Sequence, residues 1–141
     1  MSTEQKHFED FMKRREEIGA AYVEGDYAPL DAIITQHGVA TFFGPGGGHI
    51  HGPKHVATAY EKGAASFEPG GKSRFQILQM GADNGIGYWV GLQIATAKMK
   101  GKPEPIPMTL RITEIFRREG DDWKLVHRHA DMLAEEKEKP G

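Results

Sequence analysis

Two histidines and an aspartate alternate near the end of the chain, as His127, His129 and Asp131. Residues two apart on a strand share one face, so regular alternation predicts that Trp123 and Leu125 share it too. An imidazole titrates at about pH 6.5 and serves as a general acid or base at neutral pH. The spacing therefore indicates catalytic roles for the two histidines, with Asp131 orienting His129 or raising its pKa. It also fits histidines that hydrogen-bond within a sheet or pack at a dimer interface.

A second group of histidines, His49, His51 and His55, follows a glycine-rich run from Gly44 to Gly48. Joined with the first pair, these side chains could form a metal site, because neutral imidazole binds zinc, copper or nickel. No acidic residue is interleaved between His49 and His51, and the glycines leave their orientation undefined. We therefore expect no metal and no cofactor, and we assign His51 to a ligand site. No Lys-Ser/Thr pair follows the glycines, so they predict a mobile lid, not a phosphate-binding loop.

Arg111 is the charged residue whose position leaves two interpretations open. It lies between the apolar residues Leu110 and Ile112 in a strand-like run. Facing inward it would anchor an anion or a carbonyl, because a guanidinium presents a fixed fork of donors. Facing outward it would pair with a carboxylate such as Glu114 or Asp131. Glu114 has the opposite parity, so a regular strand can point only one of the two into a cavity.

Composition limits the classes of function. The chain has 141 residues, a net charge of −2 and no cysteine. These values fit one soluble domain and predict neither nucleic acid nor a membrane as a partner. Disulfides, thiolate nucleophiles and cysteine-based metal sites are excluded. The start of the chain is too charged for a secretory signal, so we expect a cytoplasmic protein.

The periodicity of the sequence changes from helical to strand-like along the chain. An apolar stripe at helical spacing runs from Phe8 to Tyr22, and it includes Arg15. Short helices are predicted from Asp26 and from Pro53, with a short strand at 39–43 between them. The remaining predicted strands form a meander with short turns and span residues 73–80, 85–97, 108–118 and 123–132.

This order predicts an α+β domain, in which a curved, mostly antiparallel sheet forms a cone-shaped barrel around the long N-terminal helix, with two further helices. The domain is expected to span residues 1–132, followed by a frayed charged tail at 133–141. A sheet curled around a helix leaves a cavity at its open end, where a ligand would bind. Trp89 and Phe43 are predicted to form part of its wall or of the core beside it.

The chain resembles the SnoaL-like, ketosteroid-isomerase-like branch of the nuclear transport factor 2-like superfamily. The matching motifs occur in the order and spacing of that family over residues 8–132. They are Glu24-Gly25-Asp26, Ile50-His51-Gly52, the pair Tyr60 and Gly63, and the hairpin from Thr113-Glu114-Ile115-Phe116-Arg117-Arg118 to Trp123-Lys124-Leu125-Val126-His127-Arg128-His129. The resemblance implies the cone fold, a homodimer built through the outer face of the sheet, and a Tyr60 phenol at the pocket.

The superfamily includes isomerases, cyclases, dehydratases, transport factors and assembly domains, so the fold does not decide the reaction. Relative to the ketosteroid isomerases, Gly44 stands in place of the carboxylate base and Ile18 in place of the tyrosine donor. Arg111 stands at or near the protonated acid. We therefore expect a domain that binds a small, apolar, oxygenated molecule. Either it is a proton-transfer enzyme of isomerase, cyclase or dehydratase type, or it is a non-catalytic binding or assembly module.

Overall fold

The computed structural model describes residues 2–134, so the predicted tail lies, from residue 135 on, outside the described residues. The long helix α1 (Thr3–Val23) begins at Ser2, whose hydroxyl oxygen accepts a hydrogen bond from the Gln5 backbone N–H. It is followed by the short helix α2 (Ala28–Asp31) and, after two strands, by α3 (Pro53–Ala64). Both of these helices carry a proline in the first turn, as predicted. None of the helices within residues 2–134 is long and apolar enough to cross a membrane.

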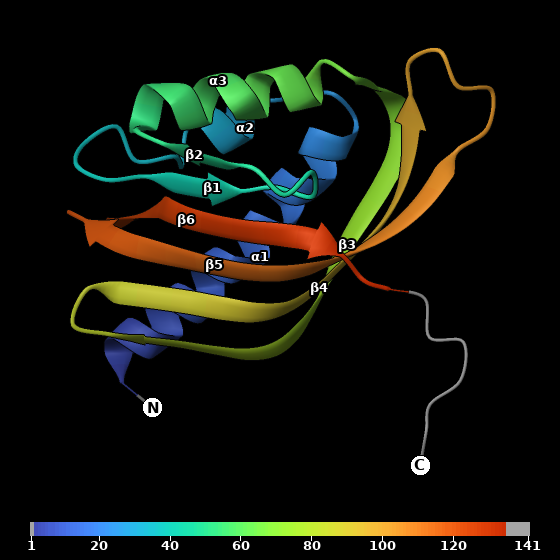
Figure 1. Cartoon of the computed structure of the whole chain (residues 1–141). Coiled ribbons are helices and arrows are strands. Elements are labelled where there is room, and N and C mark those ends of the chain that lie inside the picture. Colours follow the sequence, from blue (N-terminus) through green and yellow to red (C-terminus); the bar gives the residue numbers. More distant parts are fainter. Residues whose placement is uncertain (1, 135–141) are drawn as a thin grey trace.

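Six strands form one curved sheet that stays open at both edges (Figure 1). The strands are β1 (Thr41–Phe43), β2 (His49–His51), β3 (Phe67–Asp83), β4 (Ile86–Met99), β5 (Ile106–Glu119) and β6 (Asp122–Met132). Their order across the sheet is β2-β1-β6-β5-β4-β3, and every neighbouring pair is antiparallel except β1 with β6. The predicted meander and α+β fold are confirmed. Strand β2 was not predicted, because its three residues adjoin the glycine-rich run.

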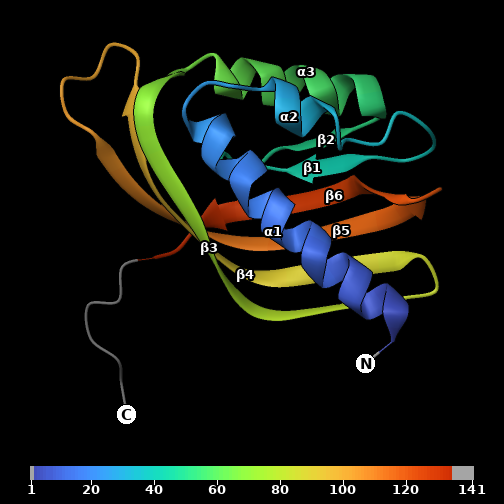
Figure 2. The ribbon, with the colours of Figure 1, turned by 180° about the vertical axis from the view of Figure 1, so that it is seen from behind.

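Helix α1 crosses the concave face of the sheet, and α3 covers the end formed by β1 and β2 (Figures 1 and 2). The apolar stripe of α1 packs into the core there, as its helical spacing predicted. Phe8 and Met12 are almost fully buried, and the Phe8 ring packs on Phe116 and Trp123 from the strands. The helix therefore forms one wall of the space that the sheet encloses.

A β-bulge in β6 reverses the facing of its second half. Ile115 of β5 pairs with His127, whereas the next residue, Phe116, pairs with Leu125, so Val126 is the extra residue. Odd-numbered residues change face at the bulge: Leu125, which precedes it, is buried, whereas His129, which follows it, is exposed. A bulge adds one residue and shifts the alternation of every side chain beyond it. The C-terminal half of β6 therefore presents its even-numbered side chains to the concave face.

Gly87 allows the Phe8 ring to lie directly on β4. A Cβ atom built at Gly87 would lie 2.6 Å from two carbons of that fully buried ring. We expect Gly87→Ala to lower the free energy of unfolding by about 1–3 kcal/mol, because overpacking forces a buried side chain to move. Urea denaturation measures the difference. Gly46→Ala is the control, since its Cβ would meet nothing within 4 Å. Equal losses from both substitutions would contradict the prediction.

Candidate functional site

The concave face of the sheet encloses a cavity of about 320 Å³ between α1, α3 and strands β4 to β6. Most of its lining is apolar, including Phe42, Leu110 and Ala130. Met99, Met108 and Met132 also line it and are partly exposed, whereas Arg15 and Tyr60 are each only 3% exposed. The cavity therefore has an apolar entrance of flexible methionines and a polar inner end. A volume of this size lies in the usual range for small-molecule sites.

The Glu114 carboxylate at the inner end joins α1 to the sheet. Its Oε1 accepts hydrogen bonds from Arg15 Nε at 2.9 Å and from the Trp89 indole N–H at 2.8 Å. Its Oε2 accepts from Arg15 Nη2 at 2.8 Å and from Arg128 Nη1 at 2.7 Å. Glu114 is fully buried, and the Arg15 and Arg128 side chains are 3% and 11% exposed. We call these four residues the Glu114 cluster.

Two donors at this end of the cavity have no hydrogen-bond partner within residues 2–134. They are Arg15 Nη1 and the Tyr60 hydroxyl, and both residues line the cavity. Arg15 Nη1 lies beside Gly19, another lining residue, because a Cβ atom built at that glycine would be 3.6 Å from the nitrogen. The neighbouring phenol, Tyr22, donates instead to the Tyr60 backbone oxygen at 2.7 Å. Buried polar groups are normally paired, so these two donors are available to an acceptor that enters the cavity.

Electrostatics fix the protonation states of these groups. Burial alone would raise the pKa of Glu114, but the charges of Arg15 and Arg128 outweigh burial and lower it to about 2. Burial raises the pKa of Tyr22 to about 12 and also raises that of Tyr60 well above its ordinary value. At neutral pH the carboxylate is therefore ionised and a weak base, and both phenols keep their protons and can donate hydrogen bonds.

The predicted catalytic pair lies on the other face of the sheet. His127 Nδ1 is 2.7 Å from the Thr41 hydroxyl oxygen, and the Phe43 ring packs edge-on against the rings of His127 and His129. His129 Nε2 is 3.3 Å from Asp131 Oδ2. Partial burial lowers the pKa of His127, and the adjacent His129 lowers it further. The prediction that these residues share a face with Trp123 and Leu125 is wrong, because the bulge at Val126 separates them.

Arg111 faces outward, which decides between its two interpretations. Its Nε and Nη2 donate to the two carboxylate oxygens of Asp131 at 2.6 and 2.8 Å, and the arginine side chain is 63% exposed. The pKa of Asp131 is lowered chiefly by the hydrogen bond from Arg111. Glu114, which has the opposite parity, points to the concave side of the sheet, where it lies buried behind the lining residues Arg15 and Arg128. The outer face thus brings together Phe43, Arg111, Asp131 and both histidines, but not beside the cavity.

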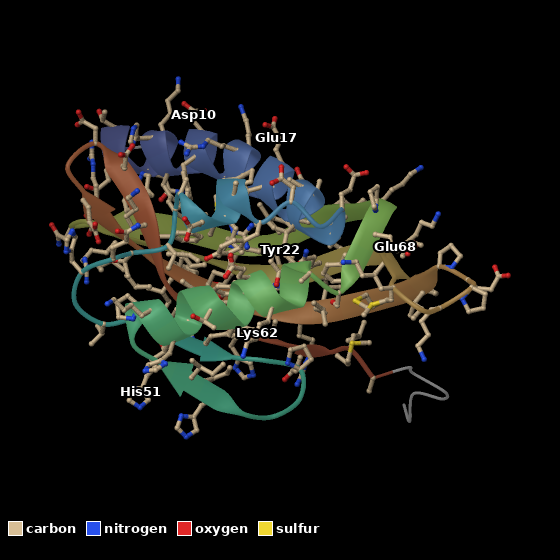
Figure 3. All side chains as sticks on the ribbon, turned by 90° about the horizontal axis from the view of Figure 1, so that it is seen from above. Asp10, Glu17, Tyr22, His51, Lys62 and Glu68 are labelled. Carbon is tan, nitrogen blue, oxygen red and sulfur yellow. The ribbon has the colours of Figure 1, made fainter. Side chains whose placement is uncertain are left out.

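The remaining predicted site residues divide between the cavity and the surface. Tyr60 lines the cavity, and Trp89 lies just behind it in the Glu114 cluster, fully buried against Phe75. His51 is exposed on β2, and Figure 3 shows it at the periphery, whereas Tyr22 lies between α1 and α3. Within residues 2–134 no three side chains of histidine, aspartate or glutamate form a group that could hold a metal ion. The roles assigned to these residues from the sequence stay predictions.

Sequence reasoning missed Arg15, Glu114 and Arg128 as site residues, although each left a signal. Arg15 is a charged residue in the middle of the apolar stripe of α1. A charge placed there must be buried and paired. In β6 the adjacent apolar residues Leu125 and Val126 break the alternation, which is how a bulge shows in a sequence. Arg128 could have been assigned to the concave face from that break.

Removing the Glu114 charge should destabilise the domain in a pH-dependent way. Glu114→Gln leaves two buried arginines without a counter-charge, and we expect a loss of about 3–5 kcal/mol in the free energy of unfolding at neutral pH. The folded-state pKa is about 2 and the ordinary value 4.5. The carboxylate thus stabilises the wild type above pH 4.5, and this contribution disappears as the pH falls toward 2. Urea denaturation from neutral to acidic pH should show the two proteins converging. A pH-independent difference would contradict the assignment.

The solved structures that this chain resembles share its fold. A protein of the nuclear transport factor 2-like superfamily from Salmonella enterica is 15% identical, with a TM-score of 0.71 over 92% of each chain. A candidate dehydratase of the NTF2-like family from Streptomyces avermitilis is 21% identical, with a TM-score of 0.67 over 82% of this chain and 87% of the other. An NTF2-like protein of unknown function from Shewanella oneidensis is 19% identical, with a TM-score of 0.63 over 89% and 97%.

The search of curated proteins found no match to this chain. The family model described as the SnoaL-like domain matches residues 15–135, which is most of the chain and includes Arg15, Tyr60, Glu114 and Arg128. With the six-stranded cone and its long first helix, this match confirms the resemblance that the sequence motifs indicated. The chain therefore belongs to the SnoaL-like domain family, and its fold is the one seen in the solved NTF2-like structures.

Proposed function

We propose that this domain binds a small, mostly apolar molecule with an oxygen-bearing end in the cavity between α1, α3 and the sheet. The observation that carries this proposal is the pair of unpartnered donors, Arg15 Nη1 and the Tyr60 hydroxyl, in an otherwise largely apolar cavity. Apolar walls supply most of the binding free energy, and a few placed polar groups fix the orientation of the ligand. The partly exposed methionines suit ligands of varied shape, because their side chains are flexible.

Retention of a ligand without chemistry is the better-supported form of this proposal. The ionisable residues among the described lining are Arg15, Tyr22, Tyr60 and Arg128. Each is protonated at neutral pH, and Glu114 behind them is a weak base with its pKa at about 2. A general base needs a pKa near the working pH and must reach the proton that it removes. His127 and His129 remain predicted catalytic residues, but a reaction using them would take place at the outer face.

Filling the cavity should abolish binding. Ala59 of α3 lines the cavity and is partly exposed, so Ala59→Trp introduces an indole there without replacing a core residue. We expect its Kd for decanol and decanoate to rise at least about tenfold. Two methylene groups that are no longer buried already account for about 1.6 kcal/mol, which corresponds to that factor. Isothermal titration calorimetry on purified protein measures the change.

Thr58→Trp is the matched control, because Thr58 is the preceding residue of the same helix and is exposed outside this cavity. It should bind both ligands as the wild type does. If both tryptophan variants bound the ligands equally weakly, the binding site would lie elsewhere. If neither ligand gave a measurable heat of binding with the wild type or the variants, the proposed function would be contradicted.

The homodimer remains a prediction. The outer face of the sheet carries a shallow hollow lined by Leu78, Val90, Leu92 and the Arg111–Asp131 pair. Leu78 is 64% exposed, so a second copy of the chain would bury an apolar side chain there. We expect Leu78→Glu to shift the wild-type dimer to a monomer in sedimentation velocity. A wild-type chain that sediments as a monomer at all concentrations would contradict the prediction.

A further inference from the structure

The Glu114 cluster carries more positive than negative charge. Arg15 and Arg128 contribute two cationic groups, and Glu114 contributes one anionic group. Trp89 and Gln93 complete the hydrogen bonds of the cluster without adding charge, because Arg128 Nη2 donates to the Gln93 side-chain oxygen at 2.7 Å. The net charge of this buried group is therefore +1. A buried charge without a counter-charge is unfavourable, so the inner end of the cavity favours an anion.

The unpartnered donors lie where that anion would be bound. Both nitrogens of Arg15 that face Glu114 are occupied, which leaves Nη1 directed to the side of Gly19. Tyr60 is held by Phe42, whose ring centroid is 4.6 Å from its own, so its hydroxyl is a fixed donor. Burial raises the pKa of the Tyr60 phenol, the charges of Arg128 and Arg15 oppose this rise and the charge of Glu114 adds to it, as expected of groups that lie close together.

We propose that the ligand of this cavity is an apolar monocarboxylate, whose carboxylate accepts hydrogen bonds from Arg15 Nη1 and the Tyr60 hydroxyl while its hydrocarbon part extends toward Met99, Met108 and Met132. This inference rests on the proposed function and specifies the class of ligand. Within the Glu114 cluster, the Glu114 carboxylate holds the Arg15 guanidinium in the position from which Nη1 would bind the ligand.

Charge decides between a carboxylate and other oxygen-bearing ends. A carboxylate brings one negative charge and cancels the net +1 of the cluster. A phosphate monoester carries about −1.5 to −2 at neutral pH and would leave an uncompensated negative charge in a buried site. A neutral hydroxyl or ketone would accept the same hydrogen bonds but leave the positive excess in place. Hydrogen bonds to ionised acceptors are also the stronger ones.

Decanoate and decanol form the deciding ligand pair. They have hydrocarbon chains of the same length, but decanoate ends in a charged carboxylate and decanol in a neutral hydroxyl. We expect decanoate to bind the wild type about 10- to 100-fold more tightly than decanol by calorimetry, as for hydrogen bonds to charged groups. Decyl phosphate should bind more weakly than decanoate. Ala59→Trp should weaken all three ligands.

Tyr60→Phe separates a ligand contact from a structural role. Its hydroxyl has no partner within residues 2–134, so its removal should leave the melting temperature of the ligand-free protein unchanged or raise it. The preference for decanoate over decanol should nevertheless fall about tenfold. Tyr22→Phe is the matched control, since it removes a cavity phenol that is already engaged with a backbone oxygen. We expect it to lower the melting temperature and to keep the preference.

Arg15→Gln should abolish the preference for decanoate while decanol still binds. If this variant does not fold, the comparison of Tyr60→Phe with Tyr22→Phe decides. Equal affinities of the wild type for decanoate and decanol, with both lost in Ala59→Trp, would overturn the carboxylate inference and leave the proposed function standing. A decanoate preference that persists in Tyr60→Phe and in every folded Arg15 variant would also overturn it. Absence of binding by all three ligands would contradict the proposed function itself.

Discussion

The ion pairs of Glu114 are the interaction on which the arrangement of this domain depends. One fully buried carboxylate joins Arg15 of α1 to Arg128 of β6 and to the Trp89 indole of β4. Transfer of three charges from water into a protein interior is unfavourable, and mutual attraction offsets it only when nearly every donor and acceptor is paired. The geometry meets that condition, with four hydrogen bonds of 2.7–2.9 Å to the carboxylate. The first helix is thereby held at one position and rotation over the sheet.

The same cluster gives the cavity its polarity. Arg15 holds α1 through one edge of its guanidinium, where Nε and Nη2 donate to Glu114. The remaining nitrogen, Nη1, is left without a partner at the cavity. In other proteins, replacing a buried ion pair by hydrophobic residues of similar volume is often neutral or stabilising, so buried charges are weak evidence for a stabilising role. The excess positive charge at the inner end therefore supports the proposal of an anionic ligand. The unpartnered Tyr60 hydroxyl supports the same conclusion, since a phenylalanine would pack there without an unpaired donor.

The two faces of the sheet separate two kinds of polar chemistry. The concave face holds buried ion pairs in which protonation is fixed over the physiological range. The outer face holds the histidines with Asp131 and Arg111, partly or largely exposed to solvent. On the outer face, partial burial and the neighbouring His129 lower the pKa of His127, and the hydrogen bond from Arg111 lowers that of Asp131. A ligand in the cavity and a partner on the outer face would therefore meet different side chains of the same strands.

The sequence by itself determined the elements and their order, because these follow from local periodicity and turn chemistry. Asn84 and Gly85, both with positive φ, close one of the short turns of the predicted meander, between β3 and β4. The apolar stripe of α1 packs on the sheet, as its helical spacing predicted. The family resemblance implied a Tyr60 phenol at the pocket; Tyr60 lines the cavity, and its role as a ligand contact stays a prediction. Strand β2 escaped prediction, since its existence depends on pairing with β1 and not on its own residues.

Only the tertiary structure decided which side chains of β5 and β6 face the cavity. The extra residue at Val126 moves Arg128 to the concave face and His127 and His129 to the outer face, and a single misplaced residue reverses every later assignment on a strand. The partnership of Arg15 with Glu114 joins residues 99 positions apart. No local pattern encodes such a contact, because it arises when the first helix packs on a sheet whose strands lie far along the sequence. The sequence thus determined the fold through short-range periodicity, whereas the site required the long-range packing that buries three charges together.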